Sequence, residues 1–311
     1  MRRQATKVVE VPVHITVSNS AELGAQPWMA KTRPHRRPVL AGVHIHPSRT
    51  RRFAVPAWVD DAWLEQRNLV AALQARRPDL ILSHLSAARF YGWPVPEQPS
   101  WHPVSVTPRR TGTRIPGFRC HRAKSLEERS RFGITIATEA EVLRQISGTL
   151  SERELVVVAD ALCGPWSGRT DGAITPELVG ERVLRAPRFS GNRRLQRALA
   201  LARVGVGSPP ETELRLRLID AGLPSPIVGH TIATSVGDLH PDLAYPVWRI
   251  ALEYEGDHHR VSGSQWDHDI TRERLIRRAG WEYLRVTARM SEAYVVGMVR
   301  EALAERGAIR L

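Results

Sequence analysis

The sequence is poor in cysteine, with only Cys120 and Cys163 among its 311 residues. Two cysteines cannot build a disulfide framework, and their spacing is not that of a zinc-thiolate site. This scarcity excludes the disulfide-rich secreted domains and favours a reducing compartment. We therefore expect inert thiols and a cytoplasmic protein.

Long apolar runs are also missing. No run in the sequence reaches the ~18 to 20 residues that span a bilayer. The stretch after Arg2 and Arg3 is interrupted by Lys7, Glu10 and Pro12, so it never forms the continuous apolar core of a signal peptide. The sequence has no repeat of fixed period and no low-complexity segment. A hydrophobic content of 42% nevertheless predicts a chain that folds around a buried core, and we expect no membrane partner.

Acidic side chains are too few to balance the basic ones. Lysine and arginine number 45 against 32 aspartates and glutamates, which gives a formal net charge of +13. The first 58 residues alone hold ten basic side chains and two acidic ones. Such an excess favours a polyanionic partner, with nucleic acid as the first candidate. A soluble basic tail, or the general arginine richness of a high-GC genome, explains the same charge equally well.

The length of the chain predicts two domains, because 311 residues exceed what one hydrophobic core usually serves. We expect a protein that is α+β overall. Its expected segments are a basic, weakly ordered stretch over 1–38, a mixed α/β domain over 39–163, a helical linker over 164–207 and a second domain over 208–311. The last boundary follows the glycine and proline residues between 205 and 210.

Residues 39–163 combine helix and strand signals, and a β-like run over 8–17 precedes them. Ser83 is placed to cap a short helix that Gly92 ends, and capping boxes at Thr138 and Ser151 open two more helices. The remaining expected elements are a strand near 38–47, a helix over 60–76, and the strands HPVSVTP, FRCHRA and FGITIAT.

Residues 208–311 give the clearest order of elements, which is α, β, β, β, α, β, α. The first helix is expected from its cap at Ser208 through Ile219, with Gly222 as its stop. The strands are expected near 227–234 and 239–244, joined by the turn SVGD, and then in WRIALEYEG and WEYLRVT. The other two helices are expected over 265–279 and 291–305.

Three carboxylates converge in this predicted sheet. Side chains alternate along WRIALEYEG, so Glu253 and Glu255 share the face opposite to Leu252. Asp242 ends the preceding strand and lies beside Glu253 if the two strands pair as a hairpin, which their short connection permits. Exposed glutamates on a strand and an aspartate before a turn are also common features without a function.

A cluster of this kind indicates a metal site. Neighbouring carboxylates repel one another unless a cation neutralises them, and hard oxygen ligands without thiolates select Mg²⁺ or Mn²⁺. An ion held by Asp242 and Glu253 could polarise a phosphodiester oxygen and lower the pKa of a bound water. The sequence therefore predicts these two residues as metal ligands.

The pattern of Asp242 followed by Glu253-Tyr254-Glu255 resembles the PD-(D/E)XK nuclease superfamily over residues 208–290. More narrowly it resembles a bacterial family of unknown function related to very-short-patch-repair endonucleases. That family combines an early helix Glu, a strand Asp, an E-x-D-G-x-x-H run and a D-x-x-R segment. The resemblance implies a restriction-endonuclease-like αβββαβ core that cleaves DNA with a metal. The matching candidates for catalysis are Glu211, Asp242, Glu253, Glu255, His259, Asp269 and Arg272.

The chain departs from the superfamily pattern at Glu255, which stands where a lysine is usual. His258, His259 or Arg272 could replace this cation, since a histidine moves protons near neutral pH and an arginine stabilises a phosphorane. A zinc site built by the two histidines with Asp257 lacks a second pair of ligands at suitable spacing.

Other matched residues also have structural alternatives. Ser208 and Glu211 have the spacing of a capping box, in which the glutamate reaches back to the first amide of the helix. Asp269 and Arg272 lie three apart on one helix face, as a surface ion pair does.

The region from Leu40 to Leu162 resembles AbiEi-type antitoxins of type IV toxin-antitoxin systems, on the runs GVHIHP, SHLSAARFYGWPVP, SVTPRR, FGITIAT and VVVADAL. The resemblance implies a protein partner such as a cognate toxin. The winged helix-turn-helix that binds DNA in those antitoxins has no counterpart in residues 1–38, where its helix signals are missing. Arginines in VTPRRTGTR and HRAKSLEERSR are candidates for phosphate contact or simply for solvated loops.

Two hypotheses follow from these patterns. The first is a Mg²⁺-dependent DNA endonuclease or nickase of the very-short-patch-repair-like type. The alternative is a DNA-binding or antitoxin-like regulatory protein whose nuclease-fold domain is catalytically inactive. Dependence of cleavage on Mg²⁺ or Mn²⁺ and on Asp242 separates them.

Overall fold

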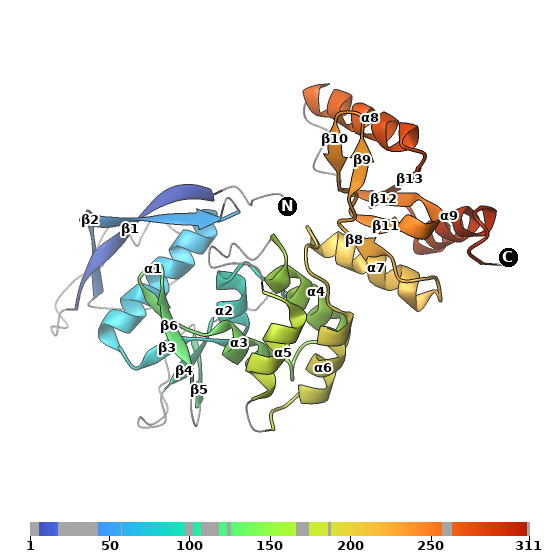
Figure 1. The fold of residues 1–311 in the computed structure, drawn as a ribbon. Coiled ribbons are helices and arrows are strands. Elements are labelled where there is room, and N and C mark those ends of the chain that lie inside the picture. The colour runs from blue at the N-terminus through green and yellow to red at the C-terminus, as the bar shows by residue number, and fades with distance from the viewer. Residues whose placement is uncertain are drawn as a thin grey trace.

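Two hydrophobic cores organise the described part of the chain in the computed structural model, which covers residues 6–17, 43–56, 58–96, 102–106, 118–122, 126–165, 174–185, 188–256 and 263–309 (Figure 1). The first core gathers residues from Val55 to Ala202 together with Leu216, and the second gathers residues from Leu214 to Leu303. Helices and sheets occur around both, so the protein is α+β as expected. Within these ranges no helix combines the length and apolarity that a membrane span requires.

A two-stranded ribbon covers helix α1 (Asp61–Arg76) of the first core. Its strands β1 (Thr6–Val17) and β2 (Val43–Pro56) pair antiparallel, with an irregularity between Pro12 and His14. Val11 of β1 and Val55 of β2 are fully buried. The described residues of the segment predicted as weakly ordered therefore form a strand of the first core. The β-like run predicted over 8–17 is thus confirmed as β1. Its pairing with β2 was not predicted, because pairing with a distant strand gives no local sequence signal.

Buried Arg67 on α1 ties the ribbon to the sheet of the first core. Its guanidinium donates to the Pro12 carbonyl at 2.7 Å and to the Phe132 carbonyl at 2.9 Å. Burial lowers the pKa of Arg67 to about 10, because desolvation disfavours the charged form. The carbonyl that accepts from this buried cation belongs to Pro12, at the start of the irregularity in β1.

A five-stranded sheet in the order β5-β4-β3-β7-β6 forms the centre of the first core. Its strands are β3 (Leu80–Leu82), β4 (His102–Val106), β5 (Phe118–Arg122), β6 (Glu128–Arg131) and β7 (Ile134–Ala137). The three predicted strands of this region correspond to β4, β5 and β7, whereas β3 and β6 were not predicted. These two are short, and β6 is polar, so neither carries the apolar alternation of a typical strand.

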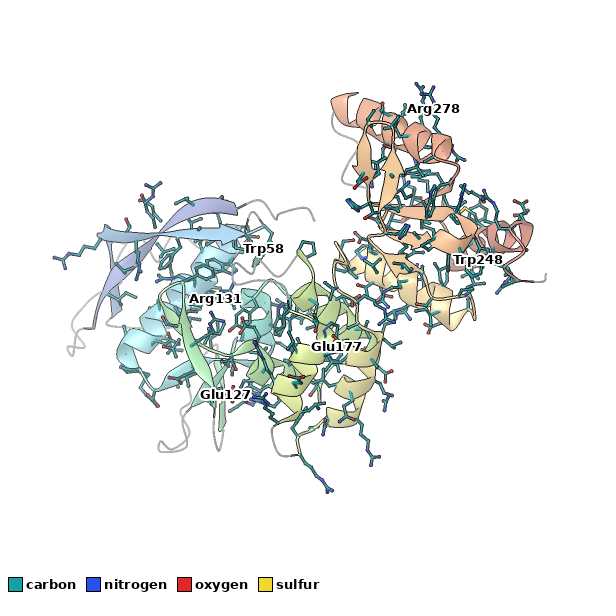
Figure 2. All side chains as sticks on the ribbon, viewed as in Figure 1. Trp58, Glu127, Arg131, Glu177, Trp248 and Arg278 are labelled. Carbon is teal, nitrogen blue, oxygen red and sulfur yellow. The ribbon has the colours of Figure 1, made fainter. Side chains whose placement is uncertain are left out.

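The predicted helix ends of this region are found with one change. Ser151 and Glu154 form the complete capping box of α4 (Glu152–Cys163), and Thr138 caps α3 (Glu139–Ile146). Gly92 follows α2 (His84–Phe90) at a φ of 78°, and a Cβ there would overlap Trp58, which Figure 2 labels. The Ser83 hydroxyl pairs with the His84 ring instead of capping a backbone amide.

The segment predicted as a helical linker packs into the first core. Helices α5 (Pro176–Leu184) and α6 (Asn192–Leu201) follow α4, and Figure 1 shows the three side by side in green and yellow. Val183 and Leu195 are completely buried there. The turn-forming residues around these helices resemble a linker in sequence, but α5 packs against α3 and α6, and α6 also packs against α4.

A four-stranded sheet in the order β13-β12-β11-β8 forms the second core, behind helix α7 (Pro209–Asp220). The strands are β8 (Ile227–Val228), β11 (Leu243–Tyr245), β12 (Ile250–Glu255) and β13 (Glu282–Thr287). A separate hairpin pairs β9 (Ile232–Thr234) with β10 (Gly237–Leu239) around the predicted turn. Each of the first two predicted strands is therefore divided in two. Gly229, at a φ of 59°, and Pro241 interrupt them.

Helices cover both faces of this sheet. Leu252 packs with α7 and α9 (Glu292–Glu305) on one face, and Ala251 packs with Ile276 of α8 (Gly263–Arg278) on the other. Arg278 ends α8 and is exposed on its outer side (Figure 2). The order of helices and strands otherwise follows the prediction, and this arrangement determines which acidic side chains face α8.

Candidate active site

The pairing of β11 with β12 brings two predicted site residues together. The strands are antiparallel, with Leu243 opposite Leu252, and continuing this register by one residue places Asp242 opposite Glu253. Asp242 Oδ2 accepts a hydrogen bond of 2.8 Å from the Tyr254 amide. The connection between the strands is short because Arg249 adopts a left-handed φ of 52°. The predicted hairpin geometry of this edge is confirmed.

The face of the sheet that carries Glu253 is the one under α8. Glu253 and Glu255 alternate with buried Leu252 as predicted. Strand β13 pairs parallel to β12, with Glu253 opposite Arg285 and Ala251 opposite Tyr283. Tyr283 and Arg285 therefore lie on the same face as the acidic residues.

Arg272 of α8 binds Glu253 directly. Its Nε lies 2.6 Å from Glu253 Oε1, and its Nη2 donates to the His240 carbonyl at 2.6 Å. The Tyr283 hydroxyl donates to Glu253 Oε2 at 3.0 Å. The side chains of Arg272 and Glu253 are only 13% and 15% exposed, so solvent screens this pair weakly. The structure thus pairs Arg272 with a strand acid.

Asp242 lies in the most unfavourable electrostatic environment of the site. Burial, followed by the nearby charges of Glu211 and Glu253, raises its pKa to about 7. The Tyr254 amide and Arg272 act in the opposite direction. Glu211, Asp242 and Glu253 therefore interact as one group, which we call the acidic edge. Near neutral pH, Asp242 ionises fully only when additional positive charge reaches it.

Glu211 belongs to the acidic edge and also bonds the two residues just before its helix. Its Oε2 accepts from the Gly207 amide at 2.8 Å, and its Oε1 accepts from the Ser208 hydroxyl at 2.9 Å. The Ser208 side chain caps no backbone amide of α7. The predicted capping box is therefore not formed, because the glutamate bonds the residue before the expected cap.

Glu255 is held by different partners from those of Glu253. Arg285 Nε lies 3.0 Å from Glu255 Oε1, and Arg285 Nη2 donates to Glu273 at 3.2 Å. Glu255 is therefore paired with a cation that strand β13 supplies.

Two residues of this face, Tyr283 and Arg285, were missed by the sequence reasoning. Burial, followed by the charge of Glu253, raises the pKa of Tyr283, so its hydroxyl remains a donor to that carboxylate. The alternation in WEYLRVT places both residues on one face. This signal becomes informative only once the parallel pairing with β12 is known.

The remaining predicted residues of the site fall outside the described part of the chain. His258 and His259, with Asp257, precede the start of α8, and the side chain of Asp269 is also outside it. Among the side chains that are described, no three His, Cys, Asp or Glu lie close enough to enclose a metal ion. Mg²⁺ is usually held by one or two carboxylates, with waters and substrate phosphates completing its shell. A pair such as Asp242 and Glu253 fits that donor chemistry.

The arrangement combines two facing carboxylates, a buried acid whose pKa is raised, and an arginine within hydrogen-bond distance of one of the carboxylates. Comparison with known proteins finds no matching family model, no matching curated protein and no matching solved structure.

Proposed function

We propose that the domain after residue 207 is a Mg²⁺- or Mn²⁺-dependent DNA endonuclease or nickase with a restriction-endonuclease-like core. The acidic edge is the observation that carries this proposal. Asp242 is buried, faces Glu253 across two strands and is subject to repulsion from the carboxylates of Glu211 and Glu253. Structural acids are rarely placed in this way without a neutralising partner, whereas metal-binding carboxylates commonly are.

Asp242 and Glu253 are the residues that would hold the ion. Asp242 Oδ2 is bound by the Tyr254 amide, and Oδ1 accepts no hydrogen bond from the described residues. Tyr283 orients Glu253 through its other carboxylate oxygen. When bound, the metal supplies a Lewis acid for a phosphodiester oxygen and lowers the pKa of a coordinated water.

Arg272 is proposed to exchange Glu253 for a substrate phosphate. Its guanidinium already lies at the acidic edge, held by one carboxylate and one carbonyl. Guanidinium groups bind phosphate oxygens bidentately, so this side chain can supply the positive charge that the superfamily's lysine supplies elsewhere. His259 is a further candidate for proton transfer by resemblance alone.

DNA is the proposed substrate because of the charge of the chain. The net charge is +13, and exposed arginines line the outer side of α8 at Arg274, Arg277 and Arg278. Contacts of this type attach a protein to the phosphate backbone without reading base sequence.

Cleavage of a supercoiled plasmid tests the proposal. Purified full-length protein should nick or linearise the plasmid with Mg²⁺ or Mn²⁺ and should be inert with EDTA. Asp242→Ala should abolish cleavage, and Glu253→Gln should reduce it strongly. Glu301→Gln removes an exposed acid on α9 and serves as the matched control, with cleavage unchanged. Cleavage that survives EDTA or Asp242→Ala would refute the assignment.

A second function, a DNA-binding or antitoxin-like regulator built on an inactive nuclease fold, is favoured by the partners of Glu253. Both of its carboxylate oxygens are engaged, by Arg272 and Tyr283. This alternative predicts binding of DNA, or of a protein partner such as a cognate toxin, without cleavage and without metal. Gel-shift assays over a salt series test it, since phosphate contacts weaken steeply with salt. Binding that requires Mg²⁺ would contradict it.

A further inference from the structure

Helix α7 belongs to both hydrophobic cores. Leu214 and Leu218 pack in the second core, whereas Leu216 packs in the first. Figure 1 shows α7, in yellow, between α4 and the strands of the second sheet. Because residues three or four apart share a helix face, Thr212, Arg215 and Leu216 form the face toward α4. The helix that carries Glu211 is therefore positioned partly by the N-terminal domain.

A buried ion pair holds these two helices together. Arg215 Nη2 of α7 lies 2.7 Å from Asp160 Oδ2 of α4, and their side chains are 0% and 1% exposed. The same oxygen accepts from the Thr212 hydroxyl at 2.8 Å, and Oδ1 accepts from the Arg203 amide at 2.6 Å. Burial raises the pKa of Asp160, and Arg215 opposes that shift. We call Asp160 with these three donors the Asp160 cluster.

The Asp160 cluster acts on the first two turns of α7. Thr212 directly follows Glu211, and Arg215 lies one turn beyond it on the same helix. Both therefore restrain the segment that carries Glu211, whose charge acts on Asp242. The acidic edge lies at the start of α7, so a small rotation or shift of this helix changes the position of Glu211.

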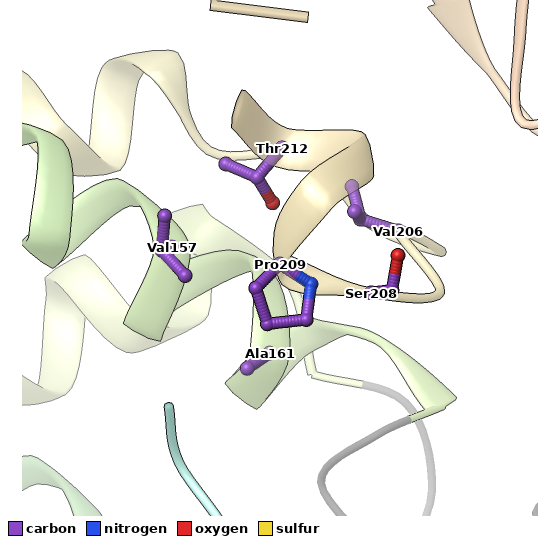
Figure 3. A pocket seen from close by; sticks show the side chains of 6 residues that line it. All are labelled: Val157, Ala161, Val206, Ser208, Pro209 and Thr212. Carbon is purple, nitrogen blue, oxygen red and sulfur yellow. The ribbon is translucent and has the colours of Figure 1, made fainter. Parts of the chain in front are cut away.

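Apolar packing and polar bonds both hold the start of α7 against α4. A small pocket lies between α4 and the beginning of α7, and its lining consists of Val157, Ala161, Val206, Ser208, Pro209 and Thr212 (Figure 3). Four of these side chains, those of Val157, Ala161, Val206 and Thr212, are buried. The hydrogen bonds of the Asp160 cluster add a directional restraint to this packing.

We infer that Asp160, a residue of the first core, is a positioning residue for the nuclease-like site, acting on Glu211 through Arg215 and Thr212. The inference rests on the proposed function, because it assigns the negative charge of Glu211 a part in the affinity of the neighbouring Asp242 for the metal. It links the N-terminal domain to the chemistry of the C-terminal one. Any ligand of the first core that moves α4 would then alter the acidic edge.

Mn²⁺ binding to the full-length protein tests the inference without relying on cleavage. Free Mn²⁺ is measured by electron paramagnetic resonance for wild type, Asp160→Asn, Glu211→Gln and the double variant. Each single change should weaken Mn²⁺ binding by about tenfold or more, as losses of supporting residues around metal ligands do. The double variant should bind no more weakly than Glu211→Gln alone, because both changes remove the same contribution. Additive losses, or a Glu211→Gln variant with unchanged affinity, would overturn the inference.

A matched control lies on the same pair of helices. Arg153 of α4 pairs with Glu213 and Asp220 of α7 at 2.6 Å each, and its side chain is 37% exposed. Arg153→Ala should leave Mn²⁺ affinity unchanged. A loss of Mn²⁺ affinity equal to that in Asp160→Asn would mean that any damage to this helix interface has the same effect, and it would contradict the inference. Thr212→Val keeps the ion pair and provides a milder variant if Asp160→Asn fails to fold. It should show a smaller loss with the same non-additivity toward Glu211→Gln.

The outcome for wild type separates this inference from the proposed function. Wild-type protein that binds no Mn²⁺ removes both. Wild-type protein that binds Mn²⁺, with an Asp160→Asn effect independent of Glu211, removes the inference alone.

Discussion

Two acid–arginine pairs of similar length lie in different surroundings, one between the two hydrophobic cores and one at the acidic edge. Asp160 and Arg215 are 2.7 Å apart and completely buried, whereas Glu253 and Arg272 are 2.6 Å apart and remain 15% and 13% exposed. The first acid receives three donors that all belong to the framework of the fold. The second pair lies at a sheet edge beside Asp242, a buried acid whose pKa remains raised. Access to solvent and the neighbouring acid, rather than bond length, distinguish a structural pair from one that can exchange its partner.

The largest expected effect is the loss of the buried pair. Asp160→Asn leaves the Arg215 charge buried without its counter-ion, and breaking such a pair costs about 3–5 kcal/mol of unfolding free energy. Urea denaturation monitored by circular dichroism measures the loss. The double change Asp160→Leu with Arg215→Met should restore most of it, since apolar replacements of buried pairs are often neutral. A loss below about 1 kcal/mol in Asp160→Asn would contradict the structural role.

The second effect is a pH dependence that arises at the acidic edge. Burial and its like-charged neighbours raise the pKa of Asp242 to about 7, well above its ordinary value of 3.8. The folded chain then binds more protons than the unfolded chain between about pH 4 and 7, so stability should fall as pH rises through that window. For a single carboxyl, the free energy of unfolding should fall by at most about 1.4 kcal/mol per pH unit there.

Urea titrations at several pH values measure this slope. Asp242→Asn cannot ionise, so it should flatten the slope while leaving the rest of the pH profile in place. Addition of Mg²⁺ should reduce the slope of wild type, because a bound cation favours the ionised carboxylate. Identical slopes in wild type and Asp242→Asn would show that Asp242 titrates normally.

The partly buried pair of Arg272 with Glu253 gives a smaller and more informative effect than the Asp160–Arg215 pair. Arg272→Gln removes a charge-assisted hydrogen bond to Glu253, which contributes about 1.5–3 kcal/mol at a partly buried site. Stability should fall by less than in Asp160→Asn, while Mn²⁺ binding should strengthen, because Arg272 competes with the ion for Glu253. Plasmid cleavage should nevertheless decrease. Weaker Mn²⁺ binding would indicate that Arg272 orients Glu253 and does not compete.

The smallest effect is expected from the exposed pairs on the same helix interface as the Asp160 cluster. Arg153→Ala removes two ion pairs that solvent screens, and pairs of this type contribute about 1 kcal/mol or less. The loss should shrink further in high salt, unlike that of Asp160→Asn. Equal losses in the two variants would remove the distinction between buried and exposed pairs.

Sequence reasoning succeeded where the relevant signal is local. The alternation along β12, the short connection to β11 and the caps at Ser151 and Thr138 depend on neighbouring residues only, and the structure contains each of them. The facing of Asp242 and Glu253 follows from these local features. Their chemical role stays a prediction.

Features that depend on distant pairing could not be predicted. The ribbon of β1 with β2 and the parallel pairing that adds Arg285 to the site join segments far apart in the chain. Asp160 carried one local signal, an acid within the apolar run VVVADAL, which indicates a buried partner without saying which. That partner, Arg215, lies on the helix that opens the second domain.

Single-turnover plasmid cleavage by wild type and Asp242→Asn, at equal protein concentration across a Mg²⁺ titration, is the decisive experiment for the proposed metal site. We predict cleavage by wild type that rises with Mg²⁺ and saturates, with none above background in the variant, while circular dichroism shows both to be folded. Equal cleavage by the two proteins, or no cleavage by folded wild type at any Mg²⁺ or Mn²⁺ concentration, would contradict the proposed function.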